Sequence, residues 1–224
     1  IRSAVAELAE SPHTWLLPDL CSETDILRVH TQALLRAVQT GHYEDVETPH
    51  FANIYELARL SAAAAVLASQ QTEPAFALMR PPGHHAERDR VMGFCYFNNV
   101  AVAVAKLLTE DAVRRVAILD FDCHHGNGTE DIIAGDERVL MVSFFQHPLY
   151  PGSGTVPKGT NMINLPIPPY TRGPEIRDLI EANWMPPLKA FAPQMVFFSA
   201  GFDAHREDEL GQLGLVEADY EWIT

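Results

Sequence analysis

One stretch of this 224-residue chain decides the fold: Ile118-Leu-Asp-Phe-Asp-Cys-His-His-Gly-Asn-Gly-Thr129. It continues the apolar run Val116-Ala-Ile-Leu119, which is typical of a strand buried on both faces of a parallel sheet. Burying two aspartates and two histidines at the end of such a strand is costly unless something compensates them. A metal ion is the usual compensation, so the stretch predicts a metal site at the carboxyl end of a buried strand.

Two further segments combine turn residues with titratable groups. They are Arg80-Pro-Pro-Gly-His-His85 and Ser199-Ala-Gly-Phe-Asp-Ala-His205, and each follows a short apolar run that we expect to be a strand. Ligands of open parallel sheets bind beyond the carboxyl ends of the strands. We therefore expect three strand ends to meet at one site.

The alternation of strand-like and helix-like segments predicts an α/β fold, with a mostly parallel sheet flanked by helices on both faces. The helix near residue 180 should break or restart at Pro186-Pro187. Ser22 or Thr24 is the candidate cap of the first helix. The expected helices are 23–38, 54–69, 98–108, 128–133, 174–191 and one starting near 216. The expected strands are 75–79, 116–120, 139–144, 163–165 and 195–199, the last of them buried.

Composition indicates an ordinary globular chain, which we interpret as one domain over residues 1–224. Hydrophobic residues make up 47% and charged residues 21% of the sequence. The three cysteines, Cys21, Cys95 and Cys123, do not form a disulfide framework and favour a reducing, cytoplasmic location. No apolar run has the length of a membrane span, and no signal peptide is visible at Ile1. The net charge of −14 argues against a nucleic-acid partner.

The candidate metal ligands are Asp122, His124 and Asp203. Asp122 and His124 are two residues apart, so their side chains can project to one side of an extended segment. Three N or O ligands with an open position are typical of catalytic zinc, and ferrous iron is accepted by the same donors. The alternative, that these aspartates cap helices and His124 packs in the core, explains fewer of the polar groups. Alternation should turn Cys123 away from the metal and into the core.

His84 and His85 are candidate general acids or bases near neutral pH. Adjacent side chains diverge in an extended segment, so the two histidines need separate partners. Two aromatic or turn-rich segments, Gly93-Phe-Cys-Tyr-Phe97 and Tyr150-Pro-Gly-Ser-Gly154, have two readings that the residues leave open. Each either lines a narrow apolar tunnel or belongs to the core.

Taken together, these motifs resemble the histone deacetylase superfamily, which includes acetoin-utilisation proteins and acetylpolyamine amidohydrolases. Gly-Asn-Gly and Gly-Phe-Asp-Ala are similar to the class II and bacterial branch. The resemblance spans residues 80 to 205, and a weaker similarity reaches back to Val29-His-Thr31 and Thr48-Pro49. The motifs that carry it are Arg80-Pro-Pro-Gly-His-His85, Gly93-Phe-Cys95 with Asn98-Asn99, Asp120-Phe-Asp-Cys-His-His-Gly-Asn-Gly-Thr129, Tyr150-Pro-Gly-Ser-Gly154 and Gly201-Phe-Asp-Ala-His205.

The resemblance implies the arginase/deacetylase fold and zinc-dependent removal of acetyl groups from acetyl-lysine. It implies that zinc is held by Asp122, His124 and Asp203. His84 and His85 would be the tandem catalytic pair, the first paired with Asp120 and the second with Asn127. A neutral partner stabilises an imidazolium less than a carboxylate does, so His85 should have a lower pKa than it would beside Asp.

The resemblance also implies roles around the substrate. The Gly93 carbonyl would accept the substrate amide N–H, and Phe94 and Tyr150 would flank the acyl-lysine methylenes. Leu210 would occupy a rim position that is acidic in polyamine-preferring members, which favours acetyl-lysine peptides over acetylated polyamines or other small amides. A structural potassium ion would be held by Asp120, the Ser143 hydroxyl and the backbone oxygens of Asp122, His124 and Phe144.

One departure from the family pattern concerns a Gly-Gly-Tyr segment whose tyrosine donates a hydrogen bond to the substrate carbonyl. No Gly-Gly-Tyr occurs in these 224 residues. Losing one such donor typically costs about 10²–10³ in rate. We therefore expect the chain to be incomplete at both ends and to lack the C-terminal part of the fold. The alternative is a catalytically degenerate metal-binding or interaction module, and the oligomeric state is left open.

Overall fold

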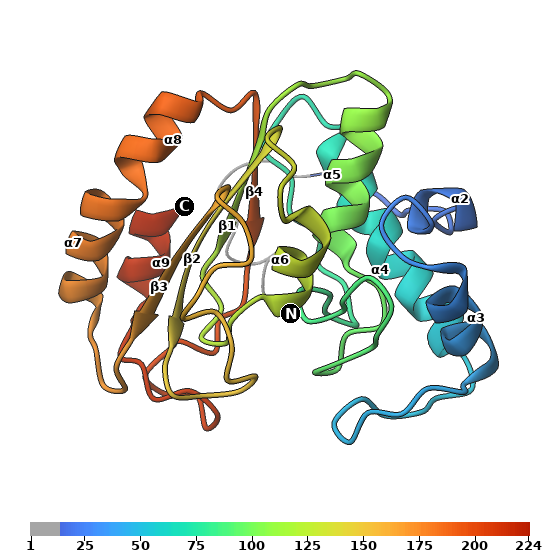
Figure 1. The fold of residues 1–224 in the computed structure, drawn as a ribbon, viewed down its shortest axis with the longest axis horizontal. Helices are drawn as coiled ribbons and strands as arrows, with labels where there is room; N and C mark the ends of the chain where they lie inside the picture. The colour runs from blue at the N-terminus through green and yellow to red at the C-terminus, as the bar shows by residue number, and fades with distance from the viewer. Residues whose placement is uncertain (1–13) are drawn as a thin grey trace.

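A four-stranded parallel sheet forms the centre of the molecule in the computed structural model, which describes residues 14–224. The strands are β1 (Val116–Asp120), β2 (Val139–Gln146), β3 (Met162–Ile167) and β4 (Met195–Ser199), in the order β3-β2-β1-β4 (Figure 1). Asp120, the last residue of β1, lies opposite Ser143 of β2 and Ser199 of β4. The register thus brings the polar residues of three strands to one level at the carboxyl end of the sheet.

Helices cover both faces of this sheet, as the sequence predicts. One face carries α4 (Ile54–Ser69), α5 (Asn99–Thr109) and α6 (Asn127–Ile133), and the other carries α7 (Gly173–Asn183), α8 (Met185–Phe191) and α9 (Glu217–Ile223) (Figure 1). Within residues 14–224, no helix is both long enough and apolar enough to cross a membrane.

The central strand β1 supplies side chains to two separate cores. Val116 and Ile118 pack with α5, whereas Ala117 and Leu119 pack with α7 and α9 on the opposite face. All five residues of β1 are buried. Burial on both faces explains why this strand reads as a continuous apolar run rather than as an alternating one.

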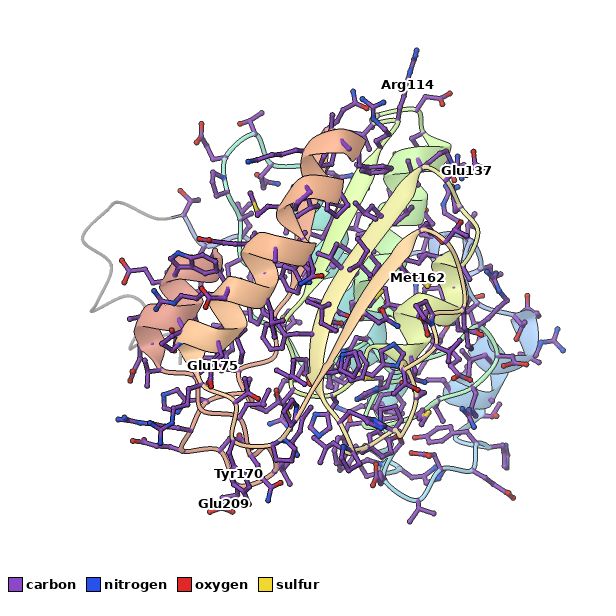
Figure 2. The ribbon with its side chains drawn as sticks, turned by 60° about the vertical axis from the view of Figure 1, so that its left-hand side comes forward. Arg114, Glu137, Met162, Tyr170, Glu175 and Glu209 are labelled. Carbon is purple, nitrogen blue, oxygen red and sulfur yellow. The ribbon has the colours of Figure 1, made fainter. Side chains whose placement is uncertain are left out.

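The two ends of the sheet have different roles. Figure 2 shows Arg114 and Glu137, which precede β1 and β2, at one end of the sheet. Tyr170 and Glu209, which follow β3 and β4, lie at the opposite end of the same view. The histidine-rich and aspartate-rich loops leave the sheet at this second end.

The first expected helix is two helices in the structure. α2 (Glu23–Ile26) begins at Ser22, whose hydroxyl accepts from the Asp25 N–H at 3.1 Å. α3 (Gln32–Thr40) begins at Thr31, whose hydroxyl accepts from the Leu34 N–H at 3.2 Å. The single helix over 23–38 is therefore wrong, because Thr31 is an N-cap that starts a new helix.

The helix with the internal prolines restarts, as expected. α7 ends at Asn183, and α8 begins at Met185, so that Pro186 lies in the first turn, where its missing N–H costs no helical bond. Trp184 lies between the two helices and is buried against the Phe144 ring, with a centroid separation of 5.8 Å. This contact anchors the junction to β2.

Two predictions about strands are wrong. Residues 75–79 carry no regular secondary structure, because none of the four strands of the described sheet pairs with them and a strand needs a partner for its backbone groups. β4 was expected to be buried, yet Val196 is 43% exposed and Phe198 36% exposed. β4 is an edge strand whose neighbour in the described sheet is β1, which leaves part of one face uncovered.

Candidate active site

The candidate site forms where the chain leaves β1 and β4. Asp122 and His124 follow β1 directly, and Asp203 comes from the loop after β4. The loop with His84 and His85 joins them, although it does not follow a strand as expected. The structure therefore brings the three polar segments together, but from two strand ends and one irregular loop.

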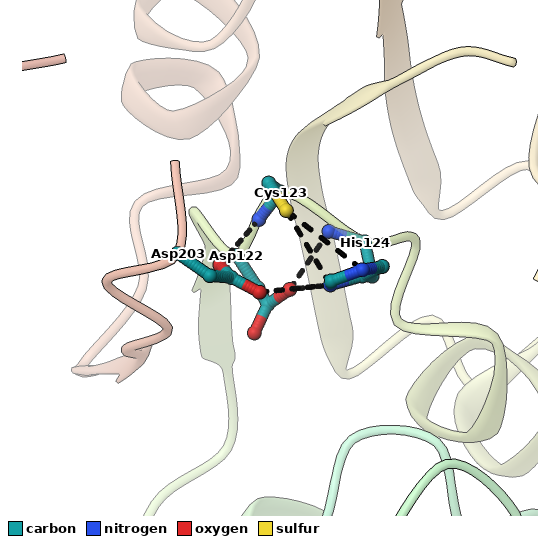
Figure 3. Close-up of side chains that lie close together, drawn as sticks. All are labelled: Asp122, Cys123, His124 and Asp203. Atoms are coloured by element: carbon teal, nitrogen blue, oxygen red, sulfur yellow. Dashed lines mark hydrogen bonds and ion pairs between the residues drawn. The ribbon is translucent and has the colours of Figure 1, made fainter. Parts of the chain in front are cut away.

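Two carboxylates converge on one imidazole at the centre of the site (Figure 3). Nδ1 of His124 lies 3.0 Å from Oδ1 of Asp122 and 2.8 Å from Oδ2 of Asp203. The remaining oxygen of Asp203, Oδ1, accepts from the Cys123 N–H at 2.9 Å, which fixes the carboxylate. The side-chain ligand atoms of Asp122, Cys123, His124 and Asp203 all lie within 4.8 Å of one another.

The charges of this cluster favour a cation. Burial opposes a charge on His124, but its hydrogen bonds to Asp122 and Asp203 outweigh burial and raise its pKa to about 12. The carboxylates of Asp122 and Asp203 thus stabilise a proton on His124, and a bound metal ion would supply that positive charge instead. Two carboxylates and one imidazole form the N and O donor set that suits zinc or ferrous iron.

Cys123 lies closer to the cluster than alternation suggested. The backbone bends after β1, and Sγ of Cys123 lies 3.4 Å from Nδ1 of His124 instead of pointing away. Burial raises the pKa of this thiol to about 12, so that it stays protonated at neutral pH. The Cys123 side chain is fully buried in the apolar cluster that packs β1 against α7 and α9, as expected of a core residue.

The two adjacent histidines have separate partners. Nδ1 of His84 lies 3.0 Å from Oδ2 of Asp120, and Nδ1 of His85 lies 2.8 Å from Oδ1 of Asn127. All four side chains are buried. The imidazole rings of His84 and His85 lie 4.0 Å apart between centroids, so a charge on one ring acts directly on the other.

Opposite environments separate the pKa values of these histidines. Burial opposes a charge on His84, but the carboxylates of Asp122 and Asp120 outweigh it and raise its pKa to about 9. Burial, and then the charge of His84, lowers the pKa of His85 to about 2. At neutral pH the pair therefore holds one protonated and one neutral imidazole, which is the arrangement that acid–base chemistry requires.

The residues of the aromatic segment 93–97 differ in burial, which bears on whether the segment lines a tunnel or belongs to the core. Phe94 is 51% exposed, whereas Cys95, Tyr96 and Phe97 are buried in the core. The backbone φ of Phe94 is +63°, a conformation rare for an aromatic residue. Gly93 lies against the site, since a Cβ there would stand 2.5 Å from Cδ2 of His85.

The Tyr150 ring lies beside two histidines of the site. Its centroid lies 5.2 Å from that of the His85 ring and 6.2 Å from that of the His124 ring. Its hydroxyl is buried and, among residues 14–224, makes no hydrogen bond of normal geometry. Burial raises the pKa of this hydroxyl, as do the nearby carboxylates of Glu47 and Asp45.

The acidic segment 45–48 was missed by sequence reasoning. The Thr48 hydroxyl accepts from the Phe94 N–H at 3.1 Å and donates to Asp45 at 2.6 Å. These contacts hold Phe94 in its left-handed conformation. No local motif marks this segment. The contact between Thr48 and Phe94 joins residues that are distant in sequence, so the sequence alone does not show it.

The histidine loop and the start of α6 are packed backbone to backbone. The carbonyl of His84 accepts from the N–H groups of Gly128 and Thr129, both at 3.0 Å. A Cβ on Gly128 would lie 2.3 Å from the carbonyl oxygen of Ala86. The buried Asn98 amide donates to that same oxygen at 3.3 Å and to the Thr129 hydroxyl at 3.1 Å. These contacts set the position of His84 and His85 relative to Asn127.

The residues expected around a monovalent cation lie on neighbouring strands. Asp120 and Ser143 are partners across β1 and β2, and Phe144 follows Ser143. Oδ1 of Asp120 accepts from the Asp122 N–H at 3.2 Å, and the Ser143 hydroxyl donates to Asn164 at 3.3 Å. Asp120 and Ser143 therefore lie side by side at the carboxyl ends of β1 and β2.

Comparison with known proteins extends these observations. The family model described as "Histone deacetylase domain" matches residues 1–224. A "Probable deacetylase" of Archaeoglobus fulgidus is 38% identical over 220 residues, covering 92% of this chain and 61% of the relative. A "Histone deacetylase-like amidohydrolase" of Pseudomonas aeruginosa is 34% identical over 220 residues, covering 91% of this chain and 58% of the relative.

The fold is also similar to that of a solved structure, an acetylpolyamine aminohydrolase from Burkholderia pseudomallei. The TM-score is 0.88 at 28% sequence identity, covering 99% of this chain and 78% of that one. The chain therefore spans about three fifths of the length of the two curated relatives and somewhat more of the solved structure.

Proposed function

This chain belongs to the histone deacetylase domain family, and we propose that it hydrolyses the amide bond of N-acetylated amines, with acetyl-lysine in a peptide as substrate. The observation that carries the proposal is geometric: the buried pairs His84–Asp120 and His85–Asn127 lie beside the carboxylate–imidazole cluster. We assign residues 1–224 to a single deacetylase-like domain.

Asp122, His124 and Asp203 would hold one divalent ion, zinc in the first place and ferrous iron as the alternative. When bound, such an ion polarises a carbonyl and lowers the pKa of water. Hydrolysis needs ligands that leave part of the ion accessible, and the three-residue N and O set does so. Asp120, Ser143 and the backbone oxygens of Asp122, His124 and Phe144 would hold a structural potassium ion.

The histidines divide the proton transfers between them. Neutral His85 takes a proton from the attacking water, and Asn127 keeps its ring in place by accepting from Nδ1. Protonated His84 gives its proton to the leaving nitrogen as the C–N bond breaks. The Asp120 carboxylate stabilises the charge on His84 until that transfer. The products are acetate and the free amine.

The walls of the site orient the acetylated side chain. The Gly93 carbonyl accepts the substrate N–H, and the rings of Phe94 and Tyr150 flank the methylenes. Leu210 is an exposed apolar residue, which favours an acyl-lysine chain over a polycation at the rim. A second candidate substrate is an acetylated polyamine, because the Burkholderia pseudomallei structure with the similar fold carries that name.

The test is hydrolysis by the purified protein supplied with zinc, with an acetyl-lysine peptide and an acetylated polyamine in competition. We expect turnover of the peptide and its loss, together with loss of bound zinc, in Asp122→Ala and His124→Ala. Asp178→Asn, on the exposed side of α7, is the matched control. Retained turnover in either ligand variant rejects the ligand assignment. Bound zinc without turnover of either substrate identifies a degenerate metal-binding module.

A further inference from the structure

The side-chain amide of Asn127 lies between a histidine and a carboxylate. Its Oδ1 lies 2.8 Å from Nδ1 of His85, and its Nδ2 donates to Oε1 of Glu87 at 2.9 Å. The same Nδ2 lies 3.3 Å from Sδ of Met92. Asn127 is 3% exposed, so that solvent offers no substitute for these partners.

The chemistry of these partners fixes the orientation of the amide. An ionised carboxylate and a thioether only accept hydrogen bonds, so both face the amide nitrogen of Asn127. The amide oxygen must then face His85, and an oxygen acceptor requires a hydrogen on Nδ1. In a neutral imidazole the second nitrogen, Nε2, then has the free lone pair.

We propose that Glu87 is a positioning residue, which acts through Asn127 to hold His85 in the tautomer with hydrogen on Nδ1. The proposal rests on the proposed function, in which His85 takes a proton. Without the Glu87 carboxylate, the side-chain amide of Asn127 can rotate by about 180° and present its N–H groups to Nδ1 of His85. That arrangement favours hydrogen on Nε2, and such an imidazole cannot accept a proton there.

Glu87 is itself held firmly by its loop. Its backbone carbonyl accepts from Nδ1 of the buried His30 at 3.0 Å, and its N–H donates to the Arg90 carbonyl at 2.9 Å. Its second carboxylate oxygen, Oε2, lies 3.0 Å from Nη2 of Arg90. Arg90 is exposed, so this ion pair contributes little, and the fixed backbone carries the positioning.

The contact between Glu87 and Asn127 also predicts that an aspartate is unfavourable at position 127. A carboxylate at position 127 would place an oxygen about where Nδ2 now donates to Glu87, and two ionised carboxylates cannot share that contact without repulsion. Asn127→Asp should therefore be damaging while Glu87 is present. Glu87→Gln supplies an N–H group to the new carboxylate and should relieve the damage.

The first experiment compares Glu87→Ala and Glu87→Gln in the zinc-supplied protein. Because partners that orient a site histidine are worth about 10- to 100-fold, we expect kcat to fall by this amount in Glu87→Ala with KM little changed. Glu87→Gln keeps an acceptor for Asn127 and should recover most of kcat. Asp89→Ala, at an exposed position on the same loop, is the matched control. Equal kcat in Glu87→Ala and its parent overturns the proposal.

A second readout does not depend on turnover. The ¹⁵N shifts of the His85 ring in the metal-free protein distinguish the two neutral tautomers. We expect hydrogen on Nδ1 in the parent and a shift toward the other tautomer in Glu87→Ala. An unchanged tautomer overturns the proposal even if the protein is an active deacetylase. Absence of deacetylation in the parent would reject the proposed function and leave this test intact.

The third experiment is a double-mutant cycle with Asn127→Asp and Glu87→Gln. We expect Asn127→Asp alone to lose more kcat than the double variant, which is a coupling that independent sites do not show. Thermal unfolding of each variant separates this effect from loss of folded protein. Additive losses in the folded variants contradict the proposed contact between Glu87 and Asn127.

Discussion

Nδ1 of His84 lies 3.0 Å from Oδ2 of Asp120, and both side chains are buried at the end of the central strand. The carboxylates of Asp122 and Asp120 outweigh burial and raise the His84 pKa to about 9. Asp120→Asn removes one of these charges, so the pKa should fall. An NMR titration of His84 measures it, with Asp111→Asn as an exposed control. An unchanged pKa would show that Asp120 does not set the charge of His84.

Buried His30 should make the folded protein acid-sensitive. Burial lowers its pKa to about 4 from an unfolded value of 6.5, and it accepts from the Asn98 N–H through Nε2. Between these two pH values the unfolded chain binds more protons than the folded protein does. The contribution of neutral, buried His30 to stability is therefore complete above pH 6.5 and is lost as pH falls toward 4. The loss amounts to as much as about 3 kcal/mol.

Urea unfolding at several pH values tests this prediction. His30→Gln should have a shallower dependence of the unfolding free energy on pH within that window than the parent protein. His42→Gln, at an exposed position, should follow the parent. Parallel curves for His30→Gln and the parent would contradict the assigned pKa.

Metal binding should release a proton. Without an ion, the carboxylates of Asp122 and Asp203 keep His124 protonated, with a pKa of about 12. A metal ion binds only neutral imidazole, so we expect about one proton released per ion at neutral pH and weaker binding as pH falls. Zinc titration calorimetry in buffers of different ionisation enthalpy measures the proton. His124→Gln should release none, and equal release from parent and variant would show that the proton comes from elsewhere.

Gly201 should be required for the metal site rather than for the fold. A Cβ at this position would stand 2.0 Å from Oδ2 of Asp122, and a carboxylate can move where a backbone cannot. We expect Gly201→Ala to fold and to bind zinc about tenfold or more weakly. Zinc affinity and thermal unfolding are measured together, and Ala200→Ser serves as the exposed neighbouring control. Parent-like affinity in Gly201→Ala would mean that Asp122 does not need its present rotamer.

The fold could be predicted where burial and sequence pattern agree. β1 is buried on both faces and its apolar run was correctly assigned, as was the restart of the helix before Pro186. Residues 75–79 have the same local pattern, but they have no partner strand in the described sheet. Pairing is a tertiary property, which the composition of five residues does not encode. Thr31 is similar, since a threonine within a helical pattern is a cap only when the backbone before it turns.

The side chains of the site were easier to predict than their arrangement. Motif residues such as His84 and Asp203 were found because their chemistry is unusual in a buried loop. Glu87 and Thr48 were not, because a surface-like acid and a threonine become significant only through distant partners. Cys123 packs in the core as predicted, but its Sγ also lies beside His124, because alternation holds only while the chain remains extended.

The close packing of His84, Ala86 and Gly128 has a consequence for protein engineering. Backbone groups, together with the Asn127 side chain, join the histidine loop to the start of α6, and Asn98 links both to α5. Such joints cannot be rebuilt by exchanging single residues. Anyone transplanting this site into another scaffold would have to move residues 83–87, 98–99 and 126–129 as one unit, and lengthening any of the three would misalign the other two.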